Sequence, residues 1–146
     1  MKLRLAVLFT FIISCLATTS AVNAESSQIQ ATVVLASSDG TGVDPQLKRF
    51  GANLKKLFRH DSFKLHGRSN TEISLPGTST LTLGRGYQLK LDASPAKDGR
   101  IRLKAKWIQG SRVLIETTLV VSRNRPSLLG GPKVKQGELI LILVAR

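Results

Sequence analysis

Apolar and polar residues alternate along most of the chain after Ser62. A period of two places successive side chains on opposite faces of a strand. Turn-forming residues interrupt the alternation about every eight to twelve positions, a spacing typical of sandwiches and barrels. The sequence therefore predicts a mainly β fold in a single domain, either an antiparallel β-sandwich or a partial barrel.

The expected strands lie between clusters of glycine, proline and aspartate, which favour turns. They cover residues 30–36, 63–67, 71–75, 80–83, 87–91, 101–108, 113–122 and 138–145. We interpret Gly130-Gly131-Pro132 as a separator and residues 25–28 as a polar leader. The last expected strand, residues 138–145, is apolar on both faces. We therefore expect it to be an inner strand that is covered on each side.

One segment has the period of a helix instead. Its apolar residues are Leu47, Phe50, Leu54, Leu57 and Phe58. Their spacing places them on one helical face, and Asp44 followed by Pro45 is typical of a helix start. We expect an amphipathic helix over residues 45–58 that packs on a sheet; the alternative is that it lies on an anionic membrane surface.

The clearest hairpin is expected to turn at Gln109-Gly110-Ser111. A three-residue connection there would place Trp107 opposite Val113 on one face. On the other face it would place Lys104 opposite Glu116, an attractive cross-strand pair.

The first 24 residues have the layout of a secretory signal peptide. Lys2 and Arg4 precede an apolar run over residues 5–16, and small residues end at Ala24. The run is shorter than the roughly 20 residues that a membrane span needs. We therefore expect residues 1–24 to be cleaved after Ala24, residues 25–146 to form the exported domain, and stable membrane insertion to be absent. Lipidation of Cys15, in a loose lipobox, is the alternative.

The chain has 22 basic and 9 acidic residues, a net charge of +13. Loss of Lys2 and Arg4 with the signal peptide would leave +11, and loss of Cys15 would leave no thiol. Such an excess of positive charge favours anionic partners. We expect a periplasmic or extracellular protein whose partner is an anionic envelope polymer or another envelope protein.

A row of basic residues is the sharpest candidate site. Arg100, Arg102, Lys104 and Lys106 alternate along one expected strand, and Lys90 on a nearby strand extends the row. Alternation places them on one face about 6.5–7 Å apart, which suits a linear polyanion. The alternative is an ordinary solvated sheet face. Nucleic acid is disfavoured, because stacking aromatics are nearly missing from this row.

No catalytic arrangement emerges from the sequence. His60, Asp61 and His66 have no metal-ligand spacing, and the segment from Asp39 to Asp44 lacks the ligand pattern of a calcium loop. We expect no metal and no cofactor, and we expect a non-catalytic domain that acts by binding or assembly. A secreted hydrolase is the further alternative; it would need a pocket that joins His60 or His66 to a carboxylate.

Several short motifs carry a resemblance. They are Leu35-Ala36-Ser37, Asp44-Pro45-Gln46-Leu47, the short helix ending near Phe58, and Leu129-Gly130-Gly131-Pro132 followed by Gly137-Glu138-Leu139-Ile140-Leu141. In this order the chain resembles small uncharacterised exported proteins of environmental bacteria. The resemblance implies export and no particular activity.

Overall fold

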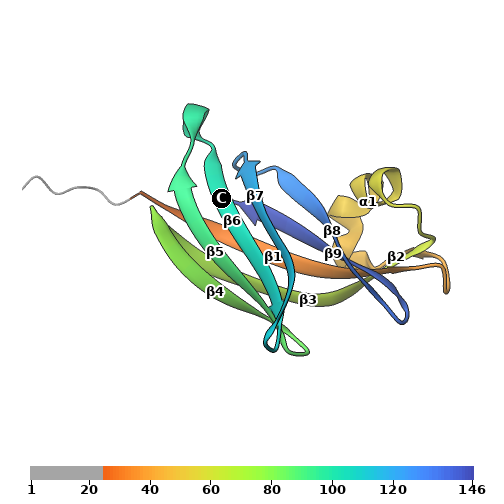
Figure 1. Ribbon diagram of the computed structural model, residues 1–146. Coiled ribbons are helices and arrows are strands. Elements are labelled where there is room, and N and C mark those ends of the chain that lie inside the picture. Colours follow the sequence, from red (N-terminus) through yellow and green to blue (C-terminus); the bar gives the residue numbers. More distant parts are fainter. Residues whose placement is uncertain (1–24) are drawn as a thin grey trace, which may run out of the picture.

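The computed structural model describes residues 25–146, which form two β-sheets and a short helical segment (Figure 1). The strands are β1 (Glu25–Ser37), β2 (Gly42–Val43), β3 (Ser62–Leu75), β4 (Gly77–Gly84), β5 (Tyr87–Pro95), β6 (Ile101–Gln109), β7 (Arg112–Val121), β8 (Pro126–Val134) and β9 (Gly137–Ala145). A 3-10 turn, η1 (Pro45–Phe50), continues into the helix α1 (Gly51–Leu57), and a second such turn, η2, covers Lys97–Gly99. The predicted mainly β fold is confirmed.

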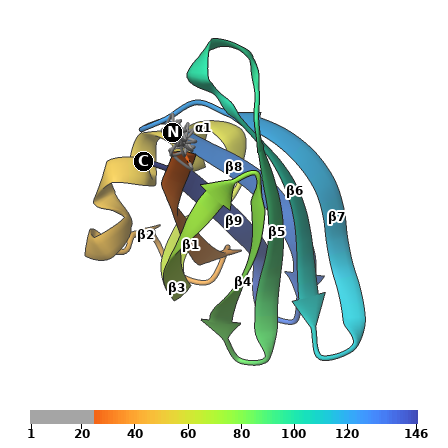
Figure 2. The ribbon, with the colours of Figure 1, turned by 90° about the vertical axis from the view of Figure 1, so that its left-hand side faces the viewer.

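The strands form a five-stranded sheet in the order β2-β3-β1-β9-β8 and a four-stranded sheet in the order β4-β5-β6-β7. Neighbouring strands are antiparallel, except that β2 runs parallel to β3. The sheets approach each other where β3 turns into β4 (Figure 2). The hydroxyls of Thr71 and Ser79 lie 2.8 Å apart near this turn. Far from this turn, near the end of β4, a Cβ at Gly67 would lie 2.1 Å from the carbonyl oxygen of Leu83, so this close approach of the two strands requires a glycine.

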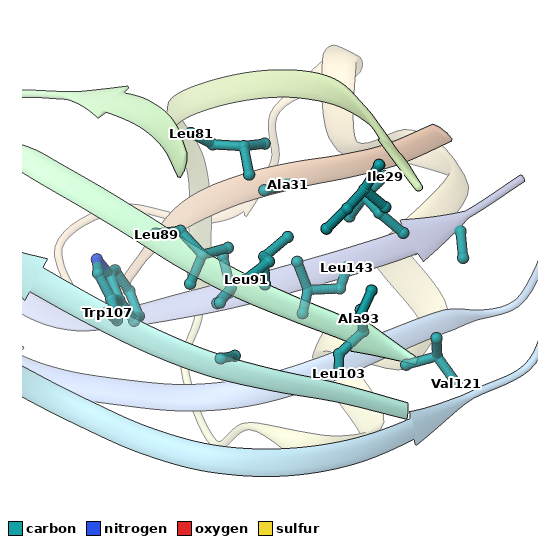
Figure 3. Packing of buried hydrophobic residues seen from close by; sticks show 14 of the residues in the cluster. Ile29, Ala31, Leu81, Leu89, Leu91, Ala93, Leu103, Trp107, Val121 and Leu143 are labelled. Carbon is teal, nitrogen blue, oxygen red and sulfur yellow. The ribbon is translucent and has the colours of Figure 1, made fainter. Parts of the chain in front are cut away.

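The space between the two sheets is filled by inward-pointing side chains of alternating strand positions (Figure 3). Leu89, Leu103 and Leu143 are fully or almost fully buried there. The ring of Trp107 lies at one end of this core, against the backbone of Gly131. The apolar residues of the sequence alternation therefore form one face of each strand, and this face points into the core.

A second cluster lies on the other side of the five-stranded sheet, under the helical segment. Leu47, Phe50 and Leu54 of the segment are buried against Val34 of β1 and Ile142 of β9. Both strands are therefore apolar on two faces, and β9 lies between β1 and β8. The predictions of a doubly covered inner strand and of a helix packed on a sheet are confirmed.

Asp44 starts the helical segment as the Asp-Pro pair predicts. Its Oδ1 accepts a hydrogen bond from the backbone N–H of Gln46 at 2.9 Å, and its Oδ2 accepts one from the N–H of Leu65 in β3 at 3.3 Å. One carboxylate thus fixes the start of the segment and joins it to the sheet.

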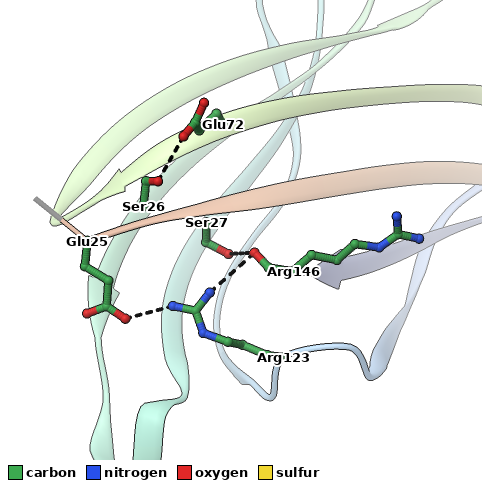
Figure 4. Close-up of polar contacts among 6 residues, drawn as sticks. All are labelled: Glu25, Ser26, Ser27, Glu72, Arg123 and Arg146. Atoms are coloured by element: carbon green, nitrogen blue, oxygen red, sulfur yellow. Dashed lines mark hydrogen bonds and ion pairs between the residues drawn. The ribbon is translucent and has the colours of Figure 1, made fainter.

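The expected polar leader is wrong, because residues 25–28 belong to β1. Polar contacts hold this end in place (Figure 4). The hydroxyl of Ser27 donates to the carbonyl oxygen of Arg146 at 2.8 Å, and Arg123 pairs with Glu25 at 2.8 Å. Backbone bonds between Gln28 and Arg146 continue the pairing with the chain's last residues.

Two strand assignments also differ from the expectation. The two short strands expected at 63–67 and 71–75 are one continuous strand, β3. A bulge interrupts its pairing with β1 at the point where the register shifts, between Val33 and Val34 of β1. β8 contains Pro126 and the whole expected separator Gly130-Gly131-Pro132. Prolines are tolerated in β8 because it is an edge strand, with β9 as its one hydrogen-bonded neighbour among residues 25–146.

The hairpin between β6 and β7 has a different register from the expected one. Gln109 pairs with Arg112 across a two-residue turn, and Leu114 is an extra residue in β7. The shift places Trp107 opposite Ile115, and Lys106, in place of Lys104, opposite Glu116. A shorter turn and an unforeseen bulge are therefore the cause of the wrong pairing.

Candidate functional site

The outer face of the four-stranded sheet carries the basic residues that the sequence singles out. In β6 the inward positions Leu103 and Ala105 are buried, and the alternate positions Arg102 and Lys104 are exposed. Lys106 continues the row, with a half-buried side chain.

Arg100 lies just before β6, and it belongs to the row only in part. Its Nε donates to the carbonyl oxygen of Lys97 at 3.2 Å, and its guanidinium lies 3.9 Å from the carboxylate of Asp98. Both contacts direct the side chain back toward the η2 turn.

Lys90 joins the row from the neighbouring strand, as expected. It pairs directly with Lys106 in the register of β5 and β6. Two ammonium groups on directly opposite residues of one sheet face repel each other, which costs stability unless an anion lies between them. We call Lys90, Arg102, Lys104 and Lys106 together the basic face.

Two carboxylates and several hydroxyls complete this surface. Asp92 lies opposite Lys104, and Glu116 lies 3.7 Å from the ammonium of Lys106. On β4, Thr78 lies opposite Asp92 and Thr80 lies opposite Lys90. Asp92 and the threonines were not predicted as part of the site, although Asp92 alternates in step with Lys90 along the sequence.

These side chains line a shallow groove of about 420 Å³ that crosses from β4 to β7. The side chains that line it carry ammonium groups, carboxylates and threonine hydroxyls. Such a groove can hold acidic groups by charge and neutral hydroxyl groups by hydrogen bonds.

The aromatic side chains of residues 25–146 lie elsewhere. Tyr87 and Trp107 point into the sandwich core, and Phe50, Phe58 and Phe63 pack with the helical segment. The groove therefore offers no ring within the described residues on which a nucleic-acid base or a sugar could stack.

The basic helical segment directs its apolar residues into the fold. Leu47 and Leu54 are fully buried, whereas Leu57 is 60% exposed. Packing on the sheet accounts for the apolar stripe without a membrane. Across residues 25–146, the helices fall short of the length and apolar character that a membrane crossing requires.

The two histidines lie in different places. The Nε2 of His60 is 3.1 Å from Oε2 of Glu138, and the Nδ1 of His60 is buried without a partner among the described residues. His66 lines a separate pocket together with Ser37 and Asp39. Within residues 25–146 no hydrogen bond joins the side chains of His66, Ser37 and Asp39 to one another. Residues 25–146 also contain no cluster of three or more metal-binding side chains.

The expected cleavage site at Ala24 and the lipidation candidate Cys15 lie outside the described residues. No protein-family model matches the chain, and neither the curated proteins nor the solved structures give a match. Export and the resemblance to small exported bacterial proteins therefore stay predictions.

Proposed function

We propose that residues 25–146 form an exported binding domain whose basic face holds a linear acidic polymer of the cell envelope. The direct pairing of Lys90 with Lys106, in one row with Arg102 and Lys104, carries the proposal. An anionic chain lying along the face would remove the repulsion between the two paired lysines and release its own counterions.

Acidic glycans suit this surface better than nucleic acid. Carboxylate, sulfate or phosphate groups of such a polymer would contact the lysines. Sugar hydroxyls would donate to Asp92 and Glu116 and exchange hydrogen bonds with Thr78 and Thr80, which line the same groove. A nucleic acid would find the positive charge without the aromatic platforms on which single-strand binding depends.

The test measures binding of purified residues 25–146 to heparin, to a polyuronate and to lipopolysaccharide over a range of salt concentrations. The double variant Arg102→Glu/Lys104→Glu should bind at least about tenfold more weakly, with a flatter dependence on salt, because two cationic contacts become repulsive.

The matched control reverses the same amount of charge on α1. Lys55 and Lys56 are exposed and lie on the other side of the molecule from the basic face. Lys55→Glu/Lys56→Glu should leave binding within about twofold, apart from the general effect of net charge. Equal losses in the two double variants would show that net charge alone drives binding and would overturn the proposal. Turnover of ester or glycoside substrates by the same preparation would favour the hydrolase alternative.

A further inference from the structure

A pocket of about 330 Å³ lies at the end of the sandwich, away from the basic face. It opens beside the β4–β5 and β8–β9 turns, which lie at the same lower end of the molecule (Figure 1). The mouths of β-barrels, which this end of the two sheets resembles in position, are common places for small-ligand sites. We call this the end pocket.

Three basic side chains line the end pocket. Lys64 and His66 come from β3, and Arg85 comes from the β4–β5 turn. The hydroxyl of Ser37 and the side-chain amide of Gln136 add neutral hydrogen-bonding groups, and Asp39 is the one carboxylate that lines the pocket. Segments distant in sequence thus bring an excess of cationic donors to one concave place.

The backbone at Arg85 gives an independent reason to regard this residue as selected for the pocket. Arg85 and Gly86 form the turn with φ angles of +52° and +77°. Turns with two positive φ angles favour asparagine, aspartate or glycine at the first position. An arginine there is a poor choice for the turn itself, so its side chain explains its presence better than its backbone does.

His66 lies between the pocket and the core. Its ring meets Tyr87 edge-on, with centroids 6.1 Å apart. Burial and the nearby charge of Arg85 lower the pKa of His66 below its ordinary value. Both effects favour the neutral ring, and an anion in the pocket would offset the charge of Arg85 and favour the protonated ring.

We propose that the end pocket binds a compact oxyanion, namely phosphate or a phosphate monoester, through Arg85, Lys64 and a protonated His66. Arg85 can donate two hydrogen bonds to one oxyanion in a fork, and Lys64 adds a point charge. Ser37 and Gln136 can donate to the remaining oxygens, and Asp39 can accept a hydrogen bond from a hydroxyl of the monoester.

The same arrangement predicts how binding depends on pH. The charged and titratable groups that line the pocket or contact His66 are Lys64, Arg85, Asp39 and Tyr87. Protonation of His66 adds a positive charge to the pocket, so affinity for sulfate, an anion whose own charge does not change in this range, should rise as the pH falls toward 5. A bound anion should in turn raise the pKa of His66 by linkage.

The experiment uses the fact that the chain contains two histidines. NMR spectra of residues 25–146 with labelled histidine are recorded during titration with inorganic phosphate, sulfate or glucose 6-phosphate, at constant ionic strength against chloride. The His66 signals should shift to saturation and its pKa should rise, while His60, which is paired with Glu138, should not respond. Saturation by glucose 6-phosphate alone would identify a monoester, and saturation by phosphate as well would identify the free ion as sufficient.

Arg85→Asn removes the guanidinium and supplies a residue that this turn favours, so the variant should fold. Its affinity for the oxyanion should fall by about tenfold or more, the typical effect of losing a charged hydrogen bond. Arg112→Asn is the matched control, because Arg112 is the first residue of β7, just after the β6–β7 turn, and does not line the pocket. It should bind within about twofold of the parent protein.

No saturable response of His66 to any of the three anions would overturn the inference, and so would equal losses in Arg85→Asn and Arg112→Asn. The outcome is independent of the proposed function. The variant Arg102→Glu/Lys104→Glu should keep the response of His66, because the basic face lies outside the end pocket.

Discussion

Gly131 determines whether the Trp107 ring fits at its end of the sandwich core. A Cβ on Gly131 would lie 2.5 Å from Cζ3 of Trp107 and 2.6 Å from the carbonyl oxygen of Leu139. Both neighbours are rigid, a large buried ring and a backbone group in β9. We expect Gly131→Ala to lower the free energy of unfolding by about 1–3 kcal/mol, the usual cost of overpacking, as measured by urea denaturation.

Gly51 provides the control for this substitution. It lies in α1 with a helical φ of −56°, and an added Cβ would meet Val43 at an ordinary 3.6 Å. Gly51→Ala should therefore raise the free energy of unfolding by about 0.5–1 kcal/mol. A similar loss of stability in both variants would mean that Trp107 does not occupy the described position.

His66 makes stability depend on pH in a definite direction. Its pKa is lowered in the folded protein, by burial first and by Arg85 second, from the value of 6.5 that it regains on unfolding. As the pH falls through about 6.5 the unfolded chain takes up the proton first, so the free energy of unfolding decreases. His66→Phe keeps a ring against Tyr87 and removes this titration. In phosphate-free buffer, its stability should change less between about pH 7.5 and 5.5 than that of the parent protein.

Among the elements, the helical segment depends on Asp44. The carboxylate accepts hydrogen bonds from Gln46 in the segment and from Leu65 in β3. Asp44→Ala removes both acceptors, and we expect it to lower the free energy of unfolding by about 0.5–2 kcal/mol, the range found for helix caps. Asp44→Asn keeps one acceptor oxygen and should cost less. Equal effects of the two substitutions in urea denaturation would contradict the capping role.

Elements with a strong period were predictable from the sequence, including the edge strands β4 and β7, whereas the edge strand β8 was not. The hydrophobic patterns of β9 and of the helical segment are unbroken. β9 packs against other residues on both of its faces, and the helical segment packs on the sheet with one face. β8 was missed because Pro126 and Pro132 are turn signals by themselves, and only the position of β8 at a sheet edge makes them compatible with a strand. Whether a strand lies at an edge is a property of the whole sheet, so no local pattern contains it.

The candidate sites show the same division. Alternation alone placed Arg102, Lys104 and Lys106 on one face, and the structure confirms that placement. The opposition of Lys90 and Lys106 depends on the register between β5 and β6, which the sequence did not determine. The end pocket depends on long-range topology, because it joins β3 to two turns of the chain. Its one local signal was the arginine between Gly84 and Gly86.

At the scale of the whole molecule, β1 and β9 join the two hydrophobic clusters. Val33 of β1 points into the sandwich core and Val34 points toward the helical segment, and β9 alternates in the same way. If the helical segment unfolded alone, it would expose the apolar residues of β1 and β9 on which it packs. We therefore expect the three layers to unfold together as one cooperative unit.

Leu54→Ala tests this cooperativity from the side of the helix. Leu54 of α1 is fully buried against the five-stranded sheet, and its truncation should lower the free energy of unfolding by about 2–5 kcal/mol. Trp107 is the single tryptophan, and it lies in the other cluster, across the five-stranded sheet. Its fluorescence should report the same decrease in denaturant midpoint as circular dichroism, because the shared strands couple the layers. A tryptophan midpoint that stays at the parent value while the dichroism midpoint falls would show that the helical layer unfolds by itself.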